Sequence, residues 1–404
     1  MSDFPWQRTA RGAGLLGSNG EIAGTIFAEM SALAVSTGAI NLGQGFPDED
    51  GPIEVRNAAK QAIDDGVNQY SPGIGHPDLI AAIVEHQKRW YDLDVPSDGV
   101  LVTAGATEAL TASLLAYLRP GDELIVFEPY YDLYAAIAGL TQATLVPVPV
   151  RGPSFLPDLE ELRSAFSDRT AMVLVNSPHN PSGSVYPVEV LDEIVRLATE
   201  HDALIVTDEV YEHLTFDAPH VPVATRCDDP DRVISISSGG KTFSATGWKI
   251  GWITTSKRRR QEIQAVKQYL TYVNGAPFQP AIAAGLRLPD CFFQTAADTL
   301  RRKRDILSEG LKAAGFTVYG AQSGYFVLAD AAPLGVTDAS EFCRQLPAIA
   351  GVVGIPANAF TRSGDRSDVR SLVRFAFCKQ ESVLVEASAR LQRAAREAAA
   401  ASVQ

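Results

Sequence analysis

The middle of the chain alternates short apolar runs, rich in β-branched residues, with longer stretches whose apolar residues recur at helical spacing. The apolar runs predict strands at 99–103, 123–129, 143–150, 171–178, 203–209, 232–238 and 248–256. Between them, helical patterns occupy 107–118, 131–140 and 188–201. Apolar strands that are separated by helices indicate a mostly parallel sheet covered by helices on both faces. The predicted fold class is therefore α/β.

The pattern changes after residue 288. A long charged helix is expected at 295–314, followed by strand-like and helical segments that predict a smaller α+β domain. An alanine-rich amphipathic helix runs to Gln404. The first residues are too rich in loop signals to fold alone. We therefore expect three parts: an N-terminal segment (1–45) that packs on the small domain, a large domain (46–288) and a small C-terminal domain (289–404).

Composition and charge narrow the class of protein. The 404 residues are 46% hydrophobic and 21% charged, which is typical of a soluble globular protein. The formal net charge of −13 argues against nonspecific nucleic-acid binding. Two basic runs, KRRR (257–260) and RRKR (301–304), lie in helical polar stretches, so we expect them on solvated helix faces.

Several features favour a cytoplasmic protein without a metal. The four cysteines are far apart and form no C-x-x-C pair, which favours a reducing compartment. The first residues contain no apolar core of a signal peptide, and no run of about 18 apolar residues predicts a membrane span. The six histidines have no paired metal-ligand spacing. We expect no metal, no membrane partner and no nucleic-acid partner.

Polar residues collect where the predicted strands end. They occur in Thr103-Ala-Gly, Glu128-Pro-Tyr, Asn176-Ser-Pro, Asp208-Glu and Ser237-Ser-Gly-Gly-Lys. In sheets of this kind, ligands bind just beyond the carboxyl ends of the strands. The sequence therefore predicts a site at this edge of the sheet.

Lys241 stands at one of these ends, in SSGGKTFSATGWKIGW (237–252). The motif G-x-x-x-x-G-K-[ST] of a phosphate-binding loop would need glycine at position 235, where the chain has Ser235. The lone GKT is therefore weak evidence for such a loop. The other interpretation is an amine nucleophile that forms a Schiff base, a role for which burial and nearby positive charge suit a lysine by lowering its pKa.

Three further features complete a cofactor site. TAGATEAL (103–110) places a glycine between a strand and a helix start, which suits one phosphate, although a plain tight turn has the same pattern. Tyr131 has the side chain to stack on a planar ring, and an ordinary buried aromatic residue is the alternative interpretation. Asp208 ends an apolar strand, where its carboxylate needs a helix cap, a salt bridge or a protonated pyridine nitrogen. Together with a Schiff-base lysine, these features indicate pyridoxal phosphate (PLP).

Longer motifs carry a resemblance to a known family. NSPHNPSG (176–183), TDEVYEHL (207–214) and the segment around Lys241 occur in the order and at the distances of fold type I PLP enzymes of the class I/II aminotransferase group. The resemblance extends from residue 41 to residue 379. GKTFSATGWK and NLGQGFPD are similar to kynurenine and glutamine aminotransferases. FAEMSALA, NQYSPG and GAPFQPA look closer to actinobacterial N-succinyldiaminopimelate aminotransferases.

The resemblance implies roles for the residues around the cofactor ring. Lys241 carries PLP and moves the proton between substrate and cofactor. Asp208 keeps the ring nitrogen protonated, and Tyr131 stacks on the ring. Asn180 and Tyr211 form hydrogen bonds with the phenolic oxygen of the cofactor ring. The residues implied to bind the phosphate are Gly105, Ala106, Thr107, Ser238 and Lys249.

The resemblance also implies how substrate and a second subunit bind. Arg374 grips the substrate α-carboxylate, a bidentate task for which lysine is poorly suited. The backbone of Gly45 approaches the same carboxylate, and Asn180 contributes to substrate binding. Tyr70 reaches the phosphate of the neighbouring subunit, which implies a homodimer with shared active sites.

The expected function is the transfer of an amino group between an amino acid, with glutamate as the expected donor, and a 2-oxo acid. One candidate is N-succinyl-LL-diaminopimelate:2-oxoglutarate aminotransferase of lysine biosynthesis. The alternatives are a kynurenine/glutamine-type aminotransferase, a PLP-dependent C–S β-lyase and a PLP-binding regulatory module. The last would usually need a fused DNA-binding domain, and no basic helix-turn-helix segment precedes residue 41. The small, polar Asn274-Gly275 argues against an aromatic substrate and for a long acylated diamino acid.

Overall fold

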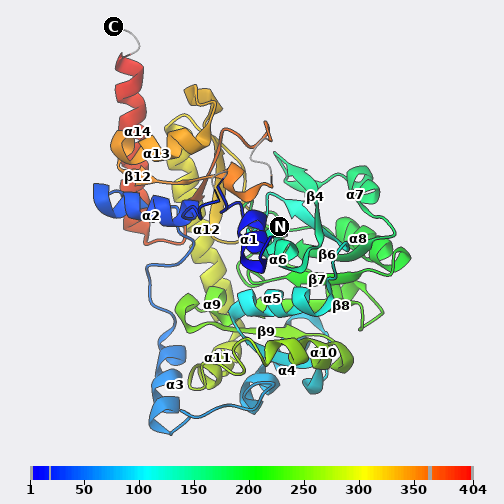
Figure 1. The fold of residues 1–404 in the computed structure, drawn as a ribbon. Helices are drawn as coiled ribbons and strands as arrows, with labels where there is room; N and C mark the ends of the chain where they lie inside the picture. The colour runs from blue at the N-terminus through cyan, green and yellow to red at the C-terminus, as the bar shows by residue number, and fades with distance from the viewer. Residues whose placement is uncertain (1–2, 18–19, 363–365, 402–404) are drawn as a thin grey trace.

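The computed structural model describes residues 3–17, 20–362 and 366–401, and its centre is an eight-stranded sheet (Figure 1). The strands lie in the order β2-β9-β8-β7-β6-β3-β4-β5. Strands β3, β4, β6, β7 and β8 are parallel to one another, whereas β9 runs antiparallel to its neighbours β8 and β2. The bounds are β2 Val100–Ala104, β3 Glu123–Glu128, β4 Thr144–Arg151, β5 Leu156–Pro157, β6 Thr170–Asn176, β7 Leu204–Asp208, β8 Val233–Ser238 and β9 Ile250–Thr254. The predicted α/β class is confirmed.

Helices cover both faces of this sheet, as the apolar strands require. Along β3, Leu124 and Val126 belong to one buried cluster, and Ile125 and Phe127 belong to another. Because side chains alternate along a strand, the two clusters lie on opposite faces. The first face packs against α5 (Gly105–Tyr117), α6 (Leu133–Thr141) and α10 (Lys257–Lys267). The second packs against α7 (Leu159–Ala165) and α8 (Val188–Glu200).

A third helical group packs against the β2 and β9 end of the sheet. It consists of α3 (Ile53–Asp64), α4 (Pro77–Tyr91) and α11 (Phe278–Leu286), which bury Val102 and Trp252 of the two strands. In Figure 1, α3, α4 and α11 lie together below β9.

The C-terminal part of the chain builds a second, smaller core. Its antiparallel sheet has the order β10-β11-β14-β13, and a short parallel pair joins β1 to β12. The strand bounds are β1 Ile40–Asn41, β10 Thr317–Val318, β11 Phe326–Asp330, β12 Val352–Val353, β13 Ile355–Pro356 and β14 Leu372–Ala376. The helices around it are α2 Ile26–Thr37, α12 Asp290–Ala313, α13 Ala339–Ala350 and α14 Glu381–Ala401. Figure 1 shows α2, α13 and α14 grouped together, with α12 running from the large sheet towards them. The predicted end of the last helix at Gln404 lies outside the described residues.

The N-terminal segment contacts both parts of the molecule. Helix α2 and β1 belong to the small core, through the β1–β12 pair and buried Met30. Helix α1 (Pro5–Gly12) instead lies on α6, so closely that a Cβ on Gly12 would be 2.2 Å from the carbonyl oxygen of Ala135. The division of the chain at residues 45 and 288 stays a prediction.

Both basic runs are helical, but one residue of each is buried. Arg260 of α10 donates to the carbonyl of Asp98, and Lys303 of α12 pairs with Glu49 at 2.6 Å. The expectation of a fully solvated face is therefore wrong for these two side chains. None of the helices in the described part of the chain is long and apolar enough to cross a bilayer.

Candidate active site

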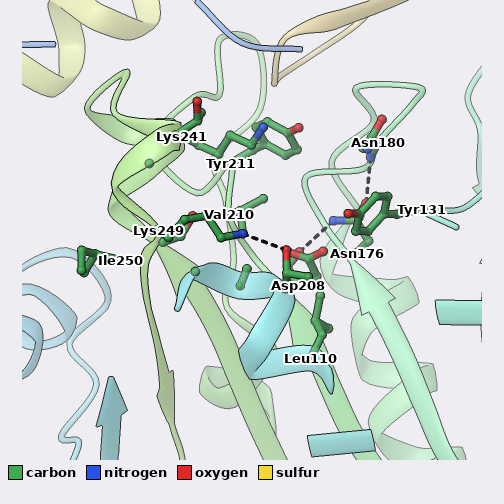
Figure 2. Close-up of a pocket in the computed structure, with 16 residues that line it drawn as sticks. Leu110, Tyr131, Asn176, Asn180, Asp208, Val210, Tyr211, Lys241, Lys249 and Ile250 are labelled. Carbon is green, nitrogen blue, oxygen red and sulfur yellow. Dashed lines mark hydrogen bonds between the residues drawn. The ribbon is translucent and has the colours of Figure 1, made fainter. Parts of the chain in front are cut away.

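The carboxyl ends of β6, β7 and β8 and the start of α5 surround a cavity of about 260 Å³ (Figure 2). The parallel register places Asn176 beside Asp208, and Asp208 beside Ile236, two residues before Ser238. The predicted residues that line the cavity are Gly105, Ala106, Thr107, Tyr131, Asn180, Asp208, Tyr211, Ser238, Lys241 and Lys249.

Lys241 projects into the cavity from the short helix α9 (Gly239–Thr242), which begins where β8 ends. Its Nζ lies 3.2 Å from the carbonyl oxygen of Gly45, and 5.6 Å and 5.5 Å from the ring centres of Tyr211 and Tyr325. The hydroxyl of Tyr325 donates to the backbone carbonyl of Lys241 at 2.5 Å and so fixes the main chain. Burial lowers the pKa of Lys241, which favours the neutral, nucleophilic amine.

Asp208 lies at the end of β7 and is buried. One oxygen, Oδ2, accepts a hydrogen bond from Tyr134 at 2.7 Å, whereas Oδ1 is buried and has no partner among the described residues. Asn176 donates to the backbone carbonyl of Asp208 at 2.9 Å. Burial raises the pKa of this carboxyl group. A cationic group beside Oδ1 would reverse that shift and satisfy the orphaned oxygen.

An anion-binding corner lies at the start of α5. Gly105 has a φ of +71°, and a Cβ at this position would be 3.3 Å from the Nζ of Lys249. Lys249 itself has a φ of 55°, a left-handed conformation that is strained for a residue with a side chain. Its Nζ lies 3.4 Å from the hydroxyl of Thr107. Free backbone N–H groups at the helix start and this ammonium group suit a phosphate.

Arg374 lies on β14 beside the cavity and is buried. Its Nη1 lies 3.2 Å from Oδ1 of Asn180, its Nη2 donates to the carbonyl of Gly43 at 2.9 Å, and its Nε has no partner among the described residues. Three aromatic rings surround the guanidinium, with its central carbon 3.8 Å from the ring centre of Phe326, 4.6 Å from that of Phe360 and 5.4 Å from that of Phe27. Burial lowers its pKa to about 10.

Gly45 lies between Lys241 and this aromatic group. A Cβ on Gly45 would be 2.1 Å from the ring of Phe326, so only glycine permits this approach. The backbone of Gly45 is thereby held close to both Lys241 and the ring that stacks on Arg374.

Tyr131, Asn180 and Tyr211 form another part of the wall (Figure 2). Asn176 accepts a hydrogen bond from the backbone N–H of Asn180 at 2.8 Å, which fixes the loop after β6. Burial raises the pKa of both tyrosines, so that they remain hydroxyl donors near neutral pH.

Tyr70 is separate from this cavity. Its side chain is 82% exposed and lies edge-on to Tyr272, with ring centres 5.4 Å apart. The structure therefore brings all the predicted site residues together or into contact with one another, apart from Tyr70.

Sequence reasoning missed several residues of the site. Asn176 and Thr246 line the cavity, Tyr134 holds Asp208, and Tyr325 holds the main chain of Lys241. Asn176 and Thr246 carried a signal, because they belong to the motifs NSPHNPSG and SSGGKTFSATGWKIGW, whereas the two tyrosines carried none. Asn274, expected to leave room for a substrate, instead donates to the backbone carbonyl of Lys249 at 2.9 Å and does not line the cavity of its own chain.

A buried polar cluster lies outside the cavity and was not foreseen from the histidine spacing. It contains His86, Glu212 and His213. The two histidine Nε2 atoms are 2.5 Å apart, whereas two nitrogen ligands of one tetrahedral zinc ion are separated by roughly 3.3 Å. Glu212 accepts hydrogen bonds from Tyr91 and Ser237. In this arrangement the two imidazole rings are hydrogen-bonded to each other.

The charges of the cavity define the ligand that it suits. Asp208, Lys241 and Arg374 form no ion pair with any other residue in the described part of the chain. Buried charges are costly unless a partner compensates them. The arrangement therefore suits a ligand with a cationic group near Asp208 and anionic groups near Lys249 and Arg374. PLP bound together with an amino acid meets these requirements.

Comparisons with known proteins agree with this geometry. The profile described as aminotransferase class I and II matches residues 37–390. The chain is 45% identical to the "Probable N-succinyldiaminopimelate aminotransferase DapC" of Mycobacterium tuberculosis (strain CDC 1551 / Oshkosh), over 91% of this chain and 95% of that protein. Two other relatives are the methionine aminotransferase of Escherichia coli (strain K12), 37% identical over 91% and 95% of the two chains, and the kynurenine–oxoglutarate transaminase 3 of Mus musculus, 34% identical over 89% and 85%.

A solved structure extends the likeness to three dimensions. The N-succinyldiaminopimelate aminotransferase of Mycobacterium tuberculosis superposes with a TM-score of 0.89 at 45% identity, covering 92% of this chain and 97% of that chain. The resemblance to fold type I aminotransferases is thus confirmed. With a match over most of its length and relatives well above 30% identity, the chain belongs to the aminotransferase class I and II family.

Proposed function

We propose that this aminotransferase uses PLP and that the cavity beside Lys241 holds it. The observation that carries the proposal is a set of three ionisable side chains that have no ion-pair partner in the described part of the chain: Asp208 and Arg374, which are buried, and Lys241, which is partly buried. Each matches one group of the cofactor or of an amino acid: the ring nitrogen, the aldehyde and the α-carboxylate.

Each wall of the cavity then has one role. Lys241 would hold the aldehyde carbon covalently, and Asp208 would pair with the ring nitrogen through its free Oδ1. Tyr131 would cover the ring, while Asn180 and Tyr211 would donate hydrogen bonds to its phenolic oxygen. The residues assigned to the phosphate are Gly105, Ala106, Thr107, Ser238 and Lys249.

When bound, PLP withdraws electrons from the substrate α-carbon and so makes its proton acidic. Once the substrate amino group has replaced Lys241 on the aldehyde carbon, the released Nζ of Lys241 would take the α-proton and deliver it to that carbon, since burial lowers its pKa. Arg374 orients the substrate by binding its carboxylate in a bidentate manner. The aromatic rings around Arg374 keep water away from this pair, which strengthens it.

Two observations favour transamination over the C–S β-lyase alternative. The family match covers most of the chain, and the three relatives described above are all named as aminotransferases or a transaminase. The cofactor residues alone do not separate the two reactions, because both begin with loss of the α-proton.

For the substrates, we propose glutamate as donor and the oxo acid of N-succinyldiaminopimelate as acceptor, in lysine biosynthesis. The support is the 45% identity to the Mycobacterium tuberculosis protein of that name. Methionine and kynurenine are the competing substrates, since relatives named for them are 37% and 34% identical.

The substrate proposal predicts a rank order of catalytic efficiency. With 2-oxoglutarate as acceptor, kcat/KM for N-succinyl-LL-diaminopimelate should exceed the values for methionine and kynurenine by about 100-fold, since a site that pairs buried polar groups with one substrate rejects others that leave them unpaired. Steady-state kinetics with the three donors measure this order. Equal or faster turnover of kynurenine would overturn the substrate proposal and leave the aminotransferase assignment intact.

An exposed aromatic cluster supports a homodimer with shared active sites. Tyr70, Tyr269, Leu270 and Tyr272 are all exposed, at 82%, 85%, 44% and 49%. Large exposed apolar patches mark interaction surfaces. We propose that this cluster meets a second copy of the chain and that Tyr70 reaches the phosphate site of that copy.

Shared sites predict complementation between two defective variants. Lys241→Ala and Tyr70→Ala homodimers should each be impaired, whereas a mixed dimer contains one site with both residues intact. Co-refolding equal amounts should restore about one quarter of the wild-type sites, because half of the dimers are mixed and each has one complete site. Activity that stays at the mean of the two parent variants would show that Tyr70 acts within its own subunit or not at all.

A further inference from the structure

Residues 42–49, which contain Gly45, lie along the end of β14 and the residues that follow it. The backbone N–H of Ala376 donates to Leu42, Arg374 donates to Gly43, and Gln380 lies 3.5 Å from the carbonyl of Asp48. Between these contacts, Lys379 donates to the carbonyl of Phe46 at 2.7 Å. The segment is therefore held at several points, one of them directly after Gly45.

Lys379 is an unusual residue to find at such a contact. It is 6% exposed, and no carboxylate in the described part of the chain pairs with it. Its ammonium group has the carbonyl of Phe46 and the face of the Phe46 ring, whose centre is 4.3 Å away. A buried cation without a counter-charge is costly, and the carbonyl and the ring of Phe46 are the two interactions that offset this cost. They therefore tie Phe46 to Lys379.

The residue that Lys379 holds is the neighbour of Gly45. The carbonyl of Gly45 accepts from Lys241 at 3.2 Å, and its Cα leaves no space for a side chain against Phe326. A small shift of Phe46 would therefore move the Gly45 peptide relative to both Lys241 and the ring that stacks on Arg374. Displacements of about 1 Å in a site of this kind can cost roughly 100-fold in rate.

We propose that Lys379 is a positioning residue that fixes the Gly45 peptide beside the carboxylate-binding Arg374. It acts through the carbonyl and the ring of Phe46 and touches neither substrate nor cofactor. This inference rests on the proposed function, in which Arg374 and Gly45 receive the substrate α-carboxylate.

The chain offers a matched control in a second buried lysine. Lys303 is 3% exposed and binds the same segment, through Glu49 at 2.6 Å, but four residues beyond Gly45. Replacing either lysine by methionine keeps an unbranched side chain, one atom shorter, and removes one anchor of the segment. A merely structural role predicts similar effects for the two variants.

The test compares Lys379→Met, Lys303→Met and the PLP-loaded wild type. Lys379→Met should raise KM for glutamate about tenfold while kcat stays within about twofold, because binding of the carboxylate is weakened and Lys241 is intact. Lys303→Met should leave KM unchanged. Lys379→Arg, which keeps a donor and a cation, should recover part of the loss.

Two readouts do not depend on turnover. Hydrogen exchange of the amides at 43–46 should be faster in Lys379→Met than in Lys303→Met, and the dissociation constant of glutarate, an unreactive dicarboxylate, should rise about tenfold in Lys379→Met only. The dissociation constant of PLP should be equal in all three proteins. If Lys379→Met does not fold, Lys379→Gln is measured in the same way.

An unchanged KM, glutarate affinity and exchange rate in folded Lys379→Met would overturn the inference, as would equal effects of Lys303→Met. Failure of the proposed function would look different, because wild-type protein would then neither retain PLP nor bind glutarate.

Discussion

Lys241→Ala is expected to lower turnover by about 10⁴-fold or more while the protein stays folded, since it removes both the covalent attachment and the proton-transfer group. The amine of Lys241 has no carboxylate partner in the described part of the chain, so its removal leaves no buried charge uncompensated. Steady-state rates measure the loss. Borohydride reduction followed by peptide mass analysis should show PLP attached to residue 241 in the wild type and nowhere in the variant.

The same substitution has a predicted effect on stability. Because burial lowers the pKa of Lys241, its charged form costs free energy in the folded apo-protein at pH values below the ordinary pKa of 10.5, and this cost disappears above that pH. Lys241→Ala should therefore be as stable as the wild type, or more stable, at pH 7 without PLP.

Thr242→Ala is the matched control for Lys241→Ala. In a nucleotide-binding loop the residue after the lysine binds the metal ion, whereas here Thr242 does not line the cavity. Loss of the Thr242 hydroxyl should leave turnover within about twofold of the wild type.

Substantial transamination by Lys241→Ala would remove this lysine from its assigned role.

Asp208→Asn is expected to lower kcat and the affinity for PLP by about 10²- to 10³-fold, the cost of breaking a buried charge pair. The asparagine has nearly the same shape, and its side-chain oxygen can still accept from Tyr134. What it lacks is the negative charge that keeps a ring nitrogen protonated. Titration of the apo-protein with PLP and single-turnover rates measure the two losses.

Asp208→Asn should not lower the stability of the apo-protein, in contrast to its effect on kcat and on the affinity for PLP. Burial raises the pKa of Asp208, so its charged form costs free energy at pH values above the ordinary pKa of 3.8, a cost that disappears below it. At pH 7, apo Asp208→Asn should melt at the same temperature as the wild type or higher. A variant with lower apo stability and normal PLP affinity would assign Asp208 a structural role instead.

The sequence was sufficient for every strand of the large sheet except the two-residue β5, and for the polar residues at the edge of the sheet. A run such as 203–209 has strand character throughout, and the polar residue that ends it must lie at the carboxyl edge where parallel strands meet. Asp208 and Lys241 were therefore predictable as neighbours. The antiparallel β9 within the sheet follows from chain topology, which periodicity alone does not reveal.

The supporting contacts were beyond a reading of the sequence. Tyr134 of α6 meets Asp208, which follows it by 74 residues, and Tyr325, directly before β11, reaches Lys241 from 84 residues later in the chain. Such pairs depend on how distant elements dock, and the local sequence around each tyrosine is compatible with an ordinary core position. Buried Lys303 is a similar case, because its charged helical surroundings predict exposure.

The most direct test of the account is the visible absorption spectrum of the PLP-loaded protein before and after glutamate is added without an acceptor. The band of the lysine-bound cofactor is expected to disappear as the amino group is transferred, and to return when 2-oxoglutarate is supplied in excess. A band that persists through glutamate, N-succinyl-LL-diaminopimelate, methionine and kynurenine, together with pyruvate release from cysteine-like substrates, would contradict the account and indicate a lyase.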